Sequence, residues 1–325
     1  MGTDTTQLTC KICKSTNRVP VERALSDLTS VVCGACKTPL LRVSGEPLPG
    51  LDAEALAHPW DREALNKLKA VPYADKILTK VFSATLDKLT HFELMAGALR
   101  ISQKQAPRLW GLYLEAAGRI DVDPPPLFIM QNPMMNAFAA GAGAPMVAVT
   151  SGLLEGLDER EIVGVLSHEL THVKLGHVLY RTLALLLAMG GTSILDKLFG
   201  IGRMLVVPIQ LALTRWVQMS ELSADRGELI GTGSLESFVR CHMLLAGGNS
   251  RYIEDLDVAA FIEQAHDAEK LRDNDLVVYA FDLMGSAKRS HPLPAWRVHH
   301  GMKWARTDAF FDLLAGAPVR ALEEK

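Results

Sequence analysis

The chain has 325 residues, of which 48% are hydrophobic and 22% are charged, and its formal net charge is −3. This length suits one small module beside one larger folded domain, and the sequence holds no internal repeat or low-complexity tract. The composition excludes a disordered chain, and the near-neutral charge excludes a strongly basic protein that binds nucleic acid along its whole length.

Four of the five cysteines form two Cys-x-x-Cys pairs near the N-terminus. The pairs are Cys10 with Cys13, and Cys33 with Cys36. With residues 14–32 between them, they have the spacing of a zinc ribbon, in which two turns place four thiolates around one structural zinc ion. Two disulfides are the alternative, but residues 1–9 are polar and show no secretory signal, which favours a reducing compartment. We therefore expect residues 1–43 to form a zinc ribbon whose fold depends on its metal.

The expected ribbon carries a mild excess of lysine and arginine over acidic residues. That excess is too small to predict nucleic-acid binding, so we expect a protein partner for this module. Residues 44–60 contain several prolines and glycines and predict a linker. The larger domain then covers residues 61–325.

Beyond the linker, the chain shows helical patterns, then short strand patterns, then helices again. The first helical patterns cover about residues 61–70, 74–99 and 104–119. Prolines at 124–126 end the last of them, and short apolar runs at 127–130 and 146–150 predict buried strands. Helices dominate from residue 158 onward. We expect an α+β fold that is mostly α-helical and contains a small β-sheet.

Residues 168–172 read His-Glu-Leu-Thr-His inside a helical pattern. Two histidines four residues apart share one face of a helix, so both rings can reach one metal ion. The glutamate between them, Glu169, is then placed to take a proton from an attacking water, as in zinc hydrolases. A helix that merely carries two histidines is the alternative. Against it, Asp158 and Glu161 predict a capping box that begins this helix, and apolar residues follow at helical spacing.

Such a site needs a third ligand besides His168 and His172, and the identity of that ligand separates the peptidase classes. Val178 stands where metzincin peptidases have a histidine, which excludes that class. His177 lies nearby, but on a straight helix it would point away from His168. We therefore expect His177 to pack at the end of the helix.

Glu221 is the better candidate for the third ligand. It lies in a helical pattern over residues 216–230 that is expected to end at Gly231. Asp225 follows four residues later on the same face, where it can accept a hydrogen bond from a ligating imidazole. Two histidines and one glutamate make a zinc site with one open position. The alternative for this pair of acids is a solvated helix face.

Together these motifs resemble the HtpX and CAAX-prenyl-protease type of zinc metallopeptidases, which are gluzincins. The resemblance covers roughly residues 73–304. Four features carry it: His-Glu-Leu-Thr-His followed by His177; Glu221 with Asp225; Asn136 to Ala139 before a glycine-rich turn and a strand; and His291-Pro292 before Arg297. The resemblance implies a gluzincin-type peptidase domain over residues 61–325.

The resemblance also implies roles for single residues. It makes His168, His172 and Glu221 the ligands of a catalytic zinc ion, with Glu169 as the general base. It places His291 near the oxyanion, and Arg297 behind the site among acidic neighbours. Asn136, Ala137 and Phe138 would lie on the edge strand of the active-site sheet, where a substrate peptide can add as a further strand.

We therefore expect a zinc-dependent endopeptidase with one catalytic and one structural zinc ion, acting on a protein or peptide. One alternative is an inactive zinc-stabilised module that recruits proteins, but such a scaffold would not need Glu169. Another is a DNA-linked protease of the SprT type, which also pairs this motif with a zinc ribbon. In that class the ribbon usually follows the catalytic domain and the third ligand is a histidine. The order found here and the presence of Glu221 therefore favour an endopeptidase of the HtpX type.

The segment over residues 178–214 is strongly apolar and lies between the two zinc-binding motifs. Its longest uncharged run, residues 182–195, is shorter than the about 20 apolar residues that a membrane-spanning helix needs. We expect a soluble cytoplasmic protein, with peripheral membrane association as the alternative.

Overall fold

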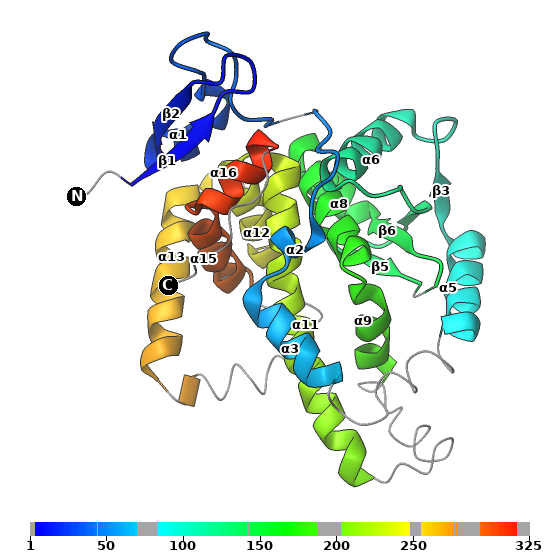
Figure 1. Ribbon diagram of the computed structural model, residues 1–325. Coiled ribbons are helices and arrows are strands. Elements are labelled where there is room, and N and C mark those ends of the chain that lie inside the picture. The colour runs from blue at the N-terminus through cyan, green and yellow to red at the C-terminus, as the bar shows by residue number, and fades with distance from the viewer. Residues whose placement is uncertain are drawn as a thin grey trace.

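The computed structural model describes residues 4–43, 45–69, 83–141, 143–186, 203–247, 255–275, 277–278 and 293–316. Within these ranges the fold is α+β and mostly helical, with a small mixed sheet and an N-terminal hairpin (Figure 1). This confirms the fold class that the sequence predicts.

The N-terminal part is a two-stranded antiparallel hairpin that carries the first pair of cysteines near its turn. β1 (Thr5–Thr9) pairs with β2 (Thr16–Pro20), so that Thr9 lies opposite Thr16. Helix α1 (Val21–Ser26) and the 3₁₀ turn η1 (Leu28–Ser30) lead to the second pair of cysteines. The hairpin lies beside α16 (Asp308–Ala315) at one end of the molecule (Figure 1).

The segment that we expected to be a linker carries α2 (Ala53–Leu56) and the start of α3 (Pro59–Lys69). Both helices pack against the long helix α11 (Arg203–Thr232). Leu48 and Leu56 are buried, and the backbone N–H of His58 donates to Ser223 Oγ at 2.8 Å. The described residues of this segment thus pack on the larger domain, while the expected division into two domains stays a prediction.

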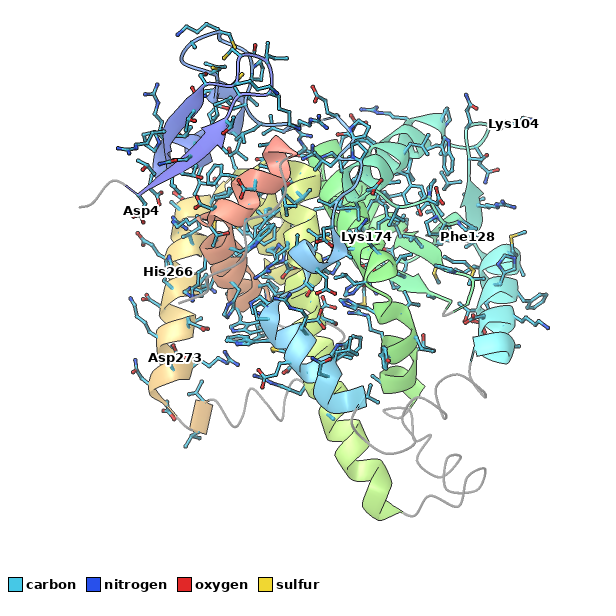
Figure 2. The ribbon with its side chains drawn as sticks, in the orientation of Figure 1. Asp4, Lys104, Phe128, Lys174, His266 and Asp273 are labelled. Carbon is cyan, nitrogen blue, oxygen red and sulfur yellow. The ribbon has the colours of Figure 1, made fainter. Side chains whose placement is uncertain are left out.

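The sheet has four strands in the order β3-β4-β6-β5. Their bounds are β3 (Leu99–Ile101), β4 (Leu127–Met130), β5 (Ala137–Ala140) and β6 (Met146–Thr150). β4 and β6 run parallel, whereas the other two pairs are antiparallel. Phe128 on β4 is fully buried in one cluster with Leu94 of α5 (Ser83–Gly97), and Figure 2 shows it on the side of the sheet near that helix. The predicted strands at 127–130 and 146–150 are therefore confirmed.

The predicted helix at 74–99 needs a correction at its end. Within the described residues α5 stops at Gly97, and Leu99 already pairs with Ile129 in the sheet. The apolar residues near 99 satisfy a strand as well as a helix, so periodicity alone could not place this boundary. The predicted residues 74–82 lie outside the described part of the chain.

Helices fill the rest of the fold. Their bounds are α6 (Pro107–Ile120), α7 (Ser151–Gly156), α8 (Glu159–Lys174), α9 (His177–Leu186), α12 (Leu235–Gly247), α13 (Val258–Asn274) and α15 (Pro294–Ala305). The predicted capping box begins α8: Asp158 Oδ1 accepts from the N–H of Glu161 at 2.9 Å, and the Glu161 carboxylate accepts from the N–H of Asp158 at 2.8 Å.

Helices α8 and α11 cross closely at the centre of the molecule, because glycines line their contact. A Cβ atom on Gly227 would lie 1.8 Å from Thr171 Oγ1, and one on Gly231 would lie 2.4 Å from Ser167 Cβ. The predicted end of this helix at Gly231 is therefore wrong. Gly231 is a packing residue inside α11, which ends at Thr232 before the positive-φ residue Gly233.

No helix within the described ranges combines the length and the apolar character that crossing a membrane requires. The apolar segment over 178–214 forms α9 and the first part of α11, with residues 187–202 outside the described part of the chain.

Candidate metal centre

The crossing of α8 and α11 brings together residues far apart in the sequence. Helix α8 contributes His168, Glu169 and His172, and α11 contributes Glu221 and Asp225. All five side chains are buried. Because Gly227 and Gly231 allow the two helices to approach, the carboxylate of Glu221 reaches both imidazoles.

The ligand atoms have spacings that suit one zinc ion. His168 Nε2 lies 3.4 Å from Glu221 Oε2, and His172 Nε2 lies 3.4 Å from Glu221 Oε1. The three ligand atoms fall within 4.8 Å of one another. Two atoms that ligate one tetrahedral zinc at about 2.0–2.1 Å are separated by about 3.3–3.4 Å. The residues present therefore fit a two-histidine, one-glutamate zinc site.

Glu169 is 2% exposed, and its Oε2 atom has no hydrogen-bond partner within the described ranges. A buried carboxylate oxygen without a partner is rare in folded proteins, because its desolvation is not compensated. Such an atom next to a metal site indicates that its partner is a small ligand such as water.

Asp225 and Arg297 lie directly behind His168. His168 Nδ1 is 3.2 Å from Asp225 Oδ1, and Arg297 Nε donates to Asp225 Oδ1 and Oδ2 at 3.1 and 3.0 Å. Burial favours a neutral carboxyl, but the Arg297 charge outweighs it and holds the pKa of Asp225 well below its usual range. Burial likewise lowers the pKa of His168, but hydrogen bonds to Asp225 and Glu221 raise it to about 10.

Sequence reasoning missed two further members of this buried network, Glu228 and His242. Glu228 Oε2 lies 3.7 Å from His168 Nδ1, and His242 on α12 lies 3.6 Å from Glu228 and 3.7 Å from Asp225. Glu228 comes three residues after Asp225, so helical spacing could have placed it on the same face. Nothing in the sequence indicates that α12 brings His242 to this point.

The position of His177 differs from the one expected on a straight helix. Helix α8 ends at Lys174, and Gly176 turns the chain with a φ of 69° before α9 begins at His177. The His177 ring therefore returns to the site: its Nδ1 lies 2.9 Å from His172 Nδ1, and its Nε2 lies 3.1 Å from Asp61 Oδ2. His177 packs beyond the helix end as expected, but it does not point away.

Arg181 is a further residue that the sequence did not single out. It lies one turn into α9, and its guanidinium donates to Glu221 Oε1. The same Nη1 atom is 3.2 Å from His172 Nε2. Burial and this arginine lower the pKa of His172 well below its usual value. The available signal was a single arginine in the otherwise uncharged run over residues 178–195.

The residues expected to contact substrate lie on or next to β5. Ala137 and Phe138 are in this strand, and Asn136 precedes it with its backbone O accepting from Thr150 N at 3.0 Å. β5 is an edge strand of the described sheet, and both α8 and α9 pack against it. His291, the residue expected near the oxyanion, lies outside the described part of the chain.

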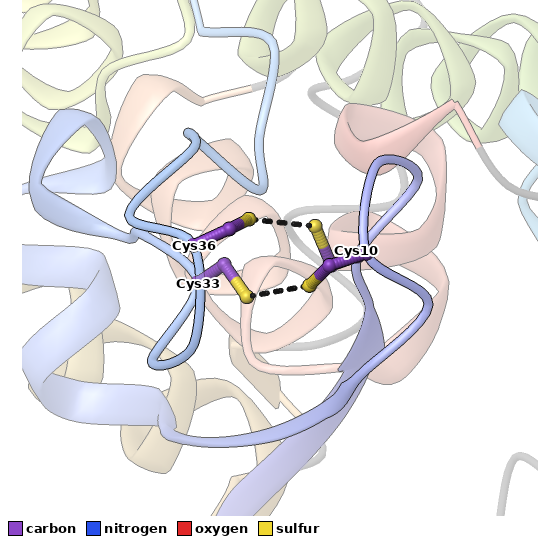
Figure 3. A group of neighbouring side chains, drawn as sticks. Cys10, Cys33 and Cys36 are labelled. Carbon is purple, nitrogen blue, oxygen red and sulfur yellow. Dashed lines mark hydrogen bonds between the residues drawn. The ribbon is translucent and has the colours of Figure 1, made fainter.

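A second group of potential metal ligands lies in residues 4–43, with two cysteines in the turn of the hairpin and two in the segment after η1. Cys10 Sγ is 3.6 Å from Cys36 Sγ, and Cys13 Sγ is 3.5 Å from Cys33 Sγ (Figure 3). These separations far exceed a disulfide bond of about 2.05 Å and approach the about 3.8 Å between two thiolates on one zinc ion. A hydroxyl from Ser15 helps to lower the pKa of Cys33 to about 5, which favours the thiolate form that binds metal.

Comparison with known proteins identifies the family. Residues 103–305 match the sequence profile of Peptidase family M48. The chain belongs to peptidase family M48. As an M48 protein it is a metallopeptidase and a hydrolase, which confirms the HtpX-like resemblance and the expected enzyme class.

Curated relatives of this M48 chain extend the likeness beyond the matched region. It is 30% identical over 277 residues to the plastoglobule-localized metallopeptidase 48, chloroplastic, of Arabidopsis thaliana. The aligned region covers 85% of this chain and 79% of that protein. It is 35% identical over 182 residues to the protease HtpX homolog of Moorella thermoacetica, covering 48% of this chain and 60% of the relative.

The HtpX homolog of Aquifex aeolicus is 42% identical over 96 residues, which is 29% of this M48 chain and 32% of the relative. No solved structure matches the chain at a significant level. M48 peptidases use zinc, and both the His168, His172 and Glu221 group and the four-cysteine group fit zinc sites.

Proposed function

We propose that the chain is a zinc-dependent endopeptidase in which His168, His172 and Glu221 hold the catalytic ion and Glu169 is the general base. The convergence of four buried side chains from α8 and α11 carries this proposal. When bound, zinc lowers the pKa of a water molecule toward about 7 and polarises a carbonyl group.

Glu169 moves the proton in this scheme. Its Oε2 atom, buried without a partner among the described residues, takes the proton of the attacking water and passes it to the leaving amine. Asp225 holds the His168 ring through Nδ1, so that Nε2 faces Glu221 and the ligand position. Arg297 in turn fixes Asp225.

The proposed substrate is an extended segment of a protein. β5 offers the outer edge of its backbone within the described sheet, and a peptide can add there as a further strand beside α8. Asn136, Ala137 and Phe138 would form this edge. His291 retains its proposed place near the oxyanion.

The four cysteines are proposed to bind a second, structural zinc ion. The Sγ separations and the lowered pKa of Cys33 support this. We propose that the ribbon contacts a protein partner, because its mild basic excess gives little support for nucleic acid.

Peripheral association with a lipid surface is proposed for the apolar segment over residues 178–214. The composition of that segment supports it, and the Arabidopsis relative is named for its plastoglobule location. Flotation with lipid vesicles tests it: the chain should float with them, and a chain that stays at the bottom of the gradient contradicts the proposal.

Cleavage of an unfolded protein such as reduced casein tests the function. We expect cleavage by the zinc-loaded chain that a chelator stops and added zinc restores, with no dependence on DNA. Metal analysis should give two zinc ions per chain, one lost in His168→Ala and the other in Cys33→Ser. A chain that keeps its full zinc content in His168→Ala, or that cuts only when DNA is present, contradicts the proposal.

A further inference from the structure

We propose that Arg181 is a further catalytic residue of the peptidase, whose guanidinium stabilises the negative charge that develops on the carbonyl oxygen of the bond being cut. This inference rests on the proposed endopeptidase function. The family resemblance gives a role near this oxygen to His291, and Arg181 would be an additional group.

The position of Arg181 in the fold supports this role. Arg181 is on α9, which packs against α8, α11 and the edge strand β5. It therefore lies beside the candidate zinc ligands, on a helix that also contacts the strand where a substrate peptide would add. Its side chain is 17% exposed, so it can be reached from solvent, whereas Glu221 beside it is fully buried.

The contacts of Arg181 place its positive charge beside the candidate zinc ligands. Nη1 is 3.2 Å from His172 Nε2 and donates to Glu221 Oε1. A guanidinium has five N–H donors in a rigid plane, so its bond to Glu221 leaves others for a substrate oxygen. A charge-assisted hydrogen bond of this kind is roughly twice as strong as a neutral one.

The other arginine of the site cannot serve in the same way. Arg297 is 5% exposed, and its Nε and Nη2 atoms are directed at the carboxylate of Asp225, on the far side of His168. Arg297 is thus enclosed among buried acids and positions His168. Arg181 also pairs with a buried carboxylate, but its side chain is more exposed, so a substrate oxygen can reach it.

The electron balance shows when Arg181 would act. As the water oxygen bonds to the carbonyl carbon, the π electrons move to the carbonyl oxygen, and Glu169 takes the proton of the water. A lone pair of this oxygen then re-forms the C=O bond as the C–N bond breaks, the electrons of the C–N bond leave with the amine nitrogen, and this nitrogen takes the proton from Glu169. Negative charge sits on the oxygen only between these events, so a donor there favours the transition state over the bound peptide.

Arg181→Gln tests the inference, because the shorter amide removes the charge and cannot bring a donor as far as the guanidinium does. We expect kcat to fall by about 10²–10³-fold with little change in KM, since removing one oxyanion donor has that effect in other hydrolases. The affinity of a phosphonate peptide, whose tetrahedral anion resembles the charged intermediate, should fall in parallel. Zinc affinity, measured by competition with a chelating dye, should change by less than about tenfold, and Arg181→Lys should recover part of kcat.

Two results would overturn the inference. One is an Arg181→Gln protein with normal kcat and normal phosphonate affinity. The other is a loss of activity that zinc loss fully explains, because Arg181 would then only support Glu221.

Arg108→Gln is the matched control, since it removes an exposed arginine that pairs with Glu159 on the surface. If wild-type protein shows no chelator-sensitive cleavage, the proposed function fails. If wild-type protein cleaves and Arg181→Gln cleaves equally well, the inference alone fails.

Discussion

At the residue scale, buried acids on α11 balance the charges of the candidate zinc ligands. Asp225 contacts both His168 and Arg297, and Glu228 adds a second carboxylate near His168 Nδ1. Asp225, together with Glu221, favours the protonated imidazole of His168 and helps to raise its pKa to about 10 against the effect of burial. Because zinc needs the neutral ring, metal binding at this site should release a proton.

Asp225→Asn should weaken zinc binding by about 10–100-fold, because residues that orient a ligating histidine typically have effects of that size. Competition with a chelating dye measures this affinity. Asp267→Asn is the matched control, since Asp267 is exposed on α13 and pairs with the exposed Lys270 at 3.1 Å. Equal zinc affinity in both variants would show that Asp225 does not orient His168.

His58 should make the fold sensitive to acid. Burial, with a contribution from Arg226, lowers its pKa to about 2, and its Nδ1 accepts from the N–H of Trp60 at 3.2 Å. The folded protein keeps this ring neutral, whereas the unfolded chain takes up a proton below about pH 6.5. Stability is therefore fully present above that pH and falls as the pH drops, by at most about 1.4 kcal/mol per unit from this group.

Urea unfolding at pH 7 and pH 5 measures this effect. The free energy of unfolding of His58→Asn should fall less than that of the wild type, because the amide still accepts from Trp60 and does not titrate. Any zinc lost at pH 5 is lost by both proteins, so the difference between them isolates His58. An identical fall in both proteins contradicts the assignment.

The spacing of ligands could be predicted from the sequence where one helix carries both members of a pair. That holds for His168 with His172, and for Glu221 with Asp225, which the structure brings together. It does not hold for His242 and Arg181, because their contacts arise from the packing of α12 and α9 on other helices. Local patterns do not encode such contacts.

At the element scale, the crossing of α8 and α11 determines the distance between the two halves of the metal centre. Three glycines face the partner helix, and none of them leaves space for a Cβ atom: Gly164, Gly227 and Gly231. Sequence periodicity predicted both helices, yet it misread Gly231 as a helix end, because a glycine selected for packing looks the same as one selected for a turn.

Gly231→Ala should lower the free energy of unfolding by about 1–3 kcal/mol, since the new methyl group would overlap the Cβ of Ser167. It should also weaken zinc binding by moving α11 away from α8. Gly111→Ala is the control, because this exposed glycine of α6 has open space around it and should gain about 0.5–1 kcal/mol. Urea unfolding measures both, and a neutral Gly231→Ala contradicts the close crossing.

At the scale of the whole molecule, hydrogen bonds join residues 4–43 to the peptidase helices. Arg42 N donates to Leu314 O on α16 at 2.8 Å, and Thr6 Oγ1 donates to Asp308 at 2.6 Å. Arg119, fully buried on α6, donates both to Arg42 O and to Ile230 O at the end of α11. The four-cysteine module is thus linked to the helix that carries Glu221.

Cys33→Ser should therefore affect more than the hairpin. We expect it to remove one zinc ion and to lower the free energy of unfolding by more than about 4 kcal/mol, as losses of structural metals do. Cys241→Ala is the control, because this cysteine is buried in α12 away from the cluster and should keep both ions. A Cys33→Ser protein whose helices melt at the wild-type temperature would show that the module is independent.

The rate of casein cleavage by zinc-loaded Glu169→Gln shows whether Glu169 is the base of a zinc peptidase. The amide keeps the size of the side chain but cannot take a proton, so we expect zinc content to stay at the wild-type level and cleavage to fall by at least about 10²–10⁴-fold. Cleavage at the wild-type rate would contradict the account.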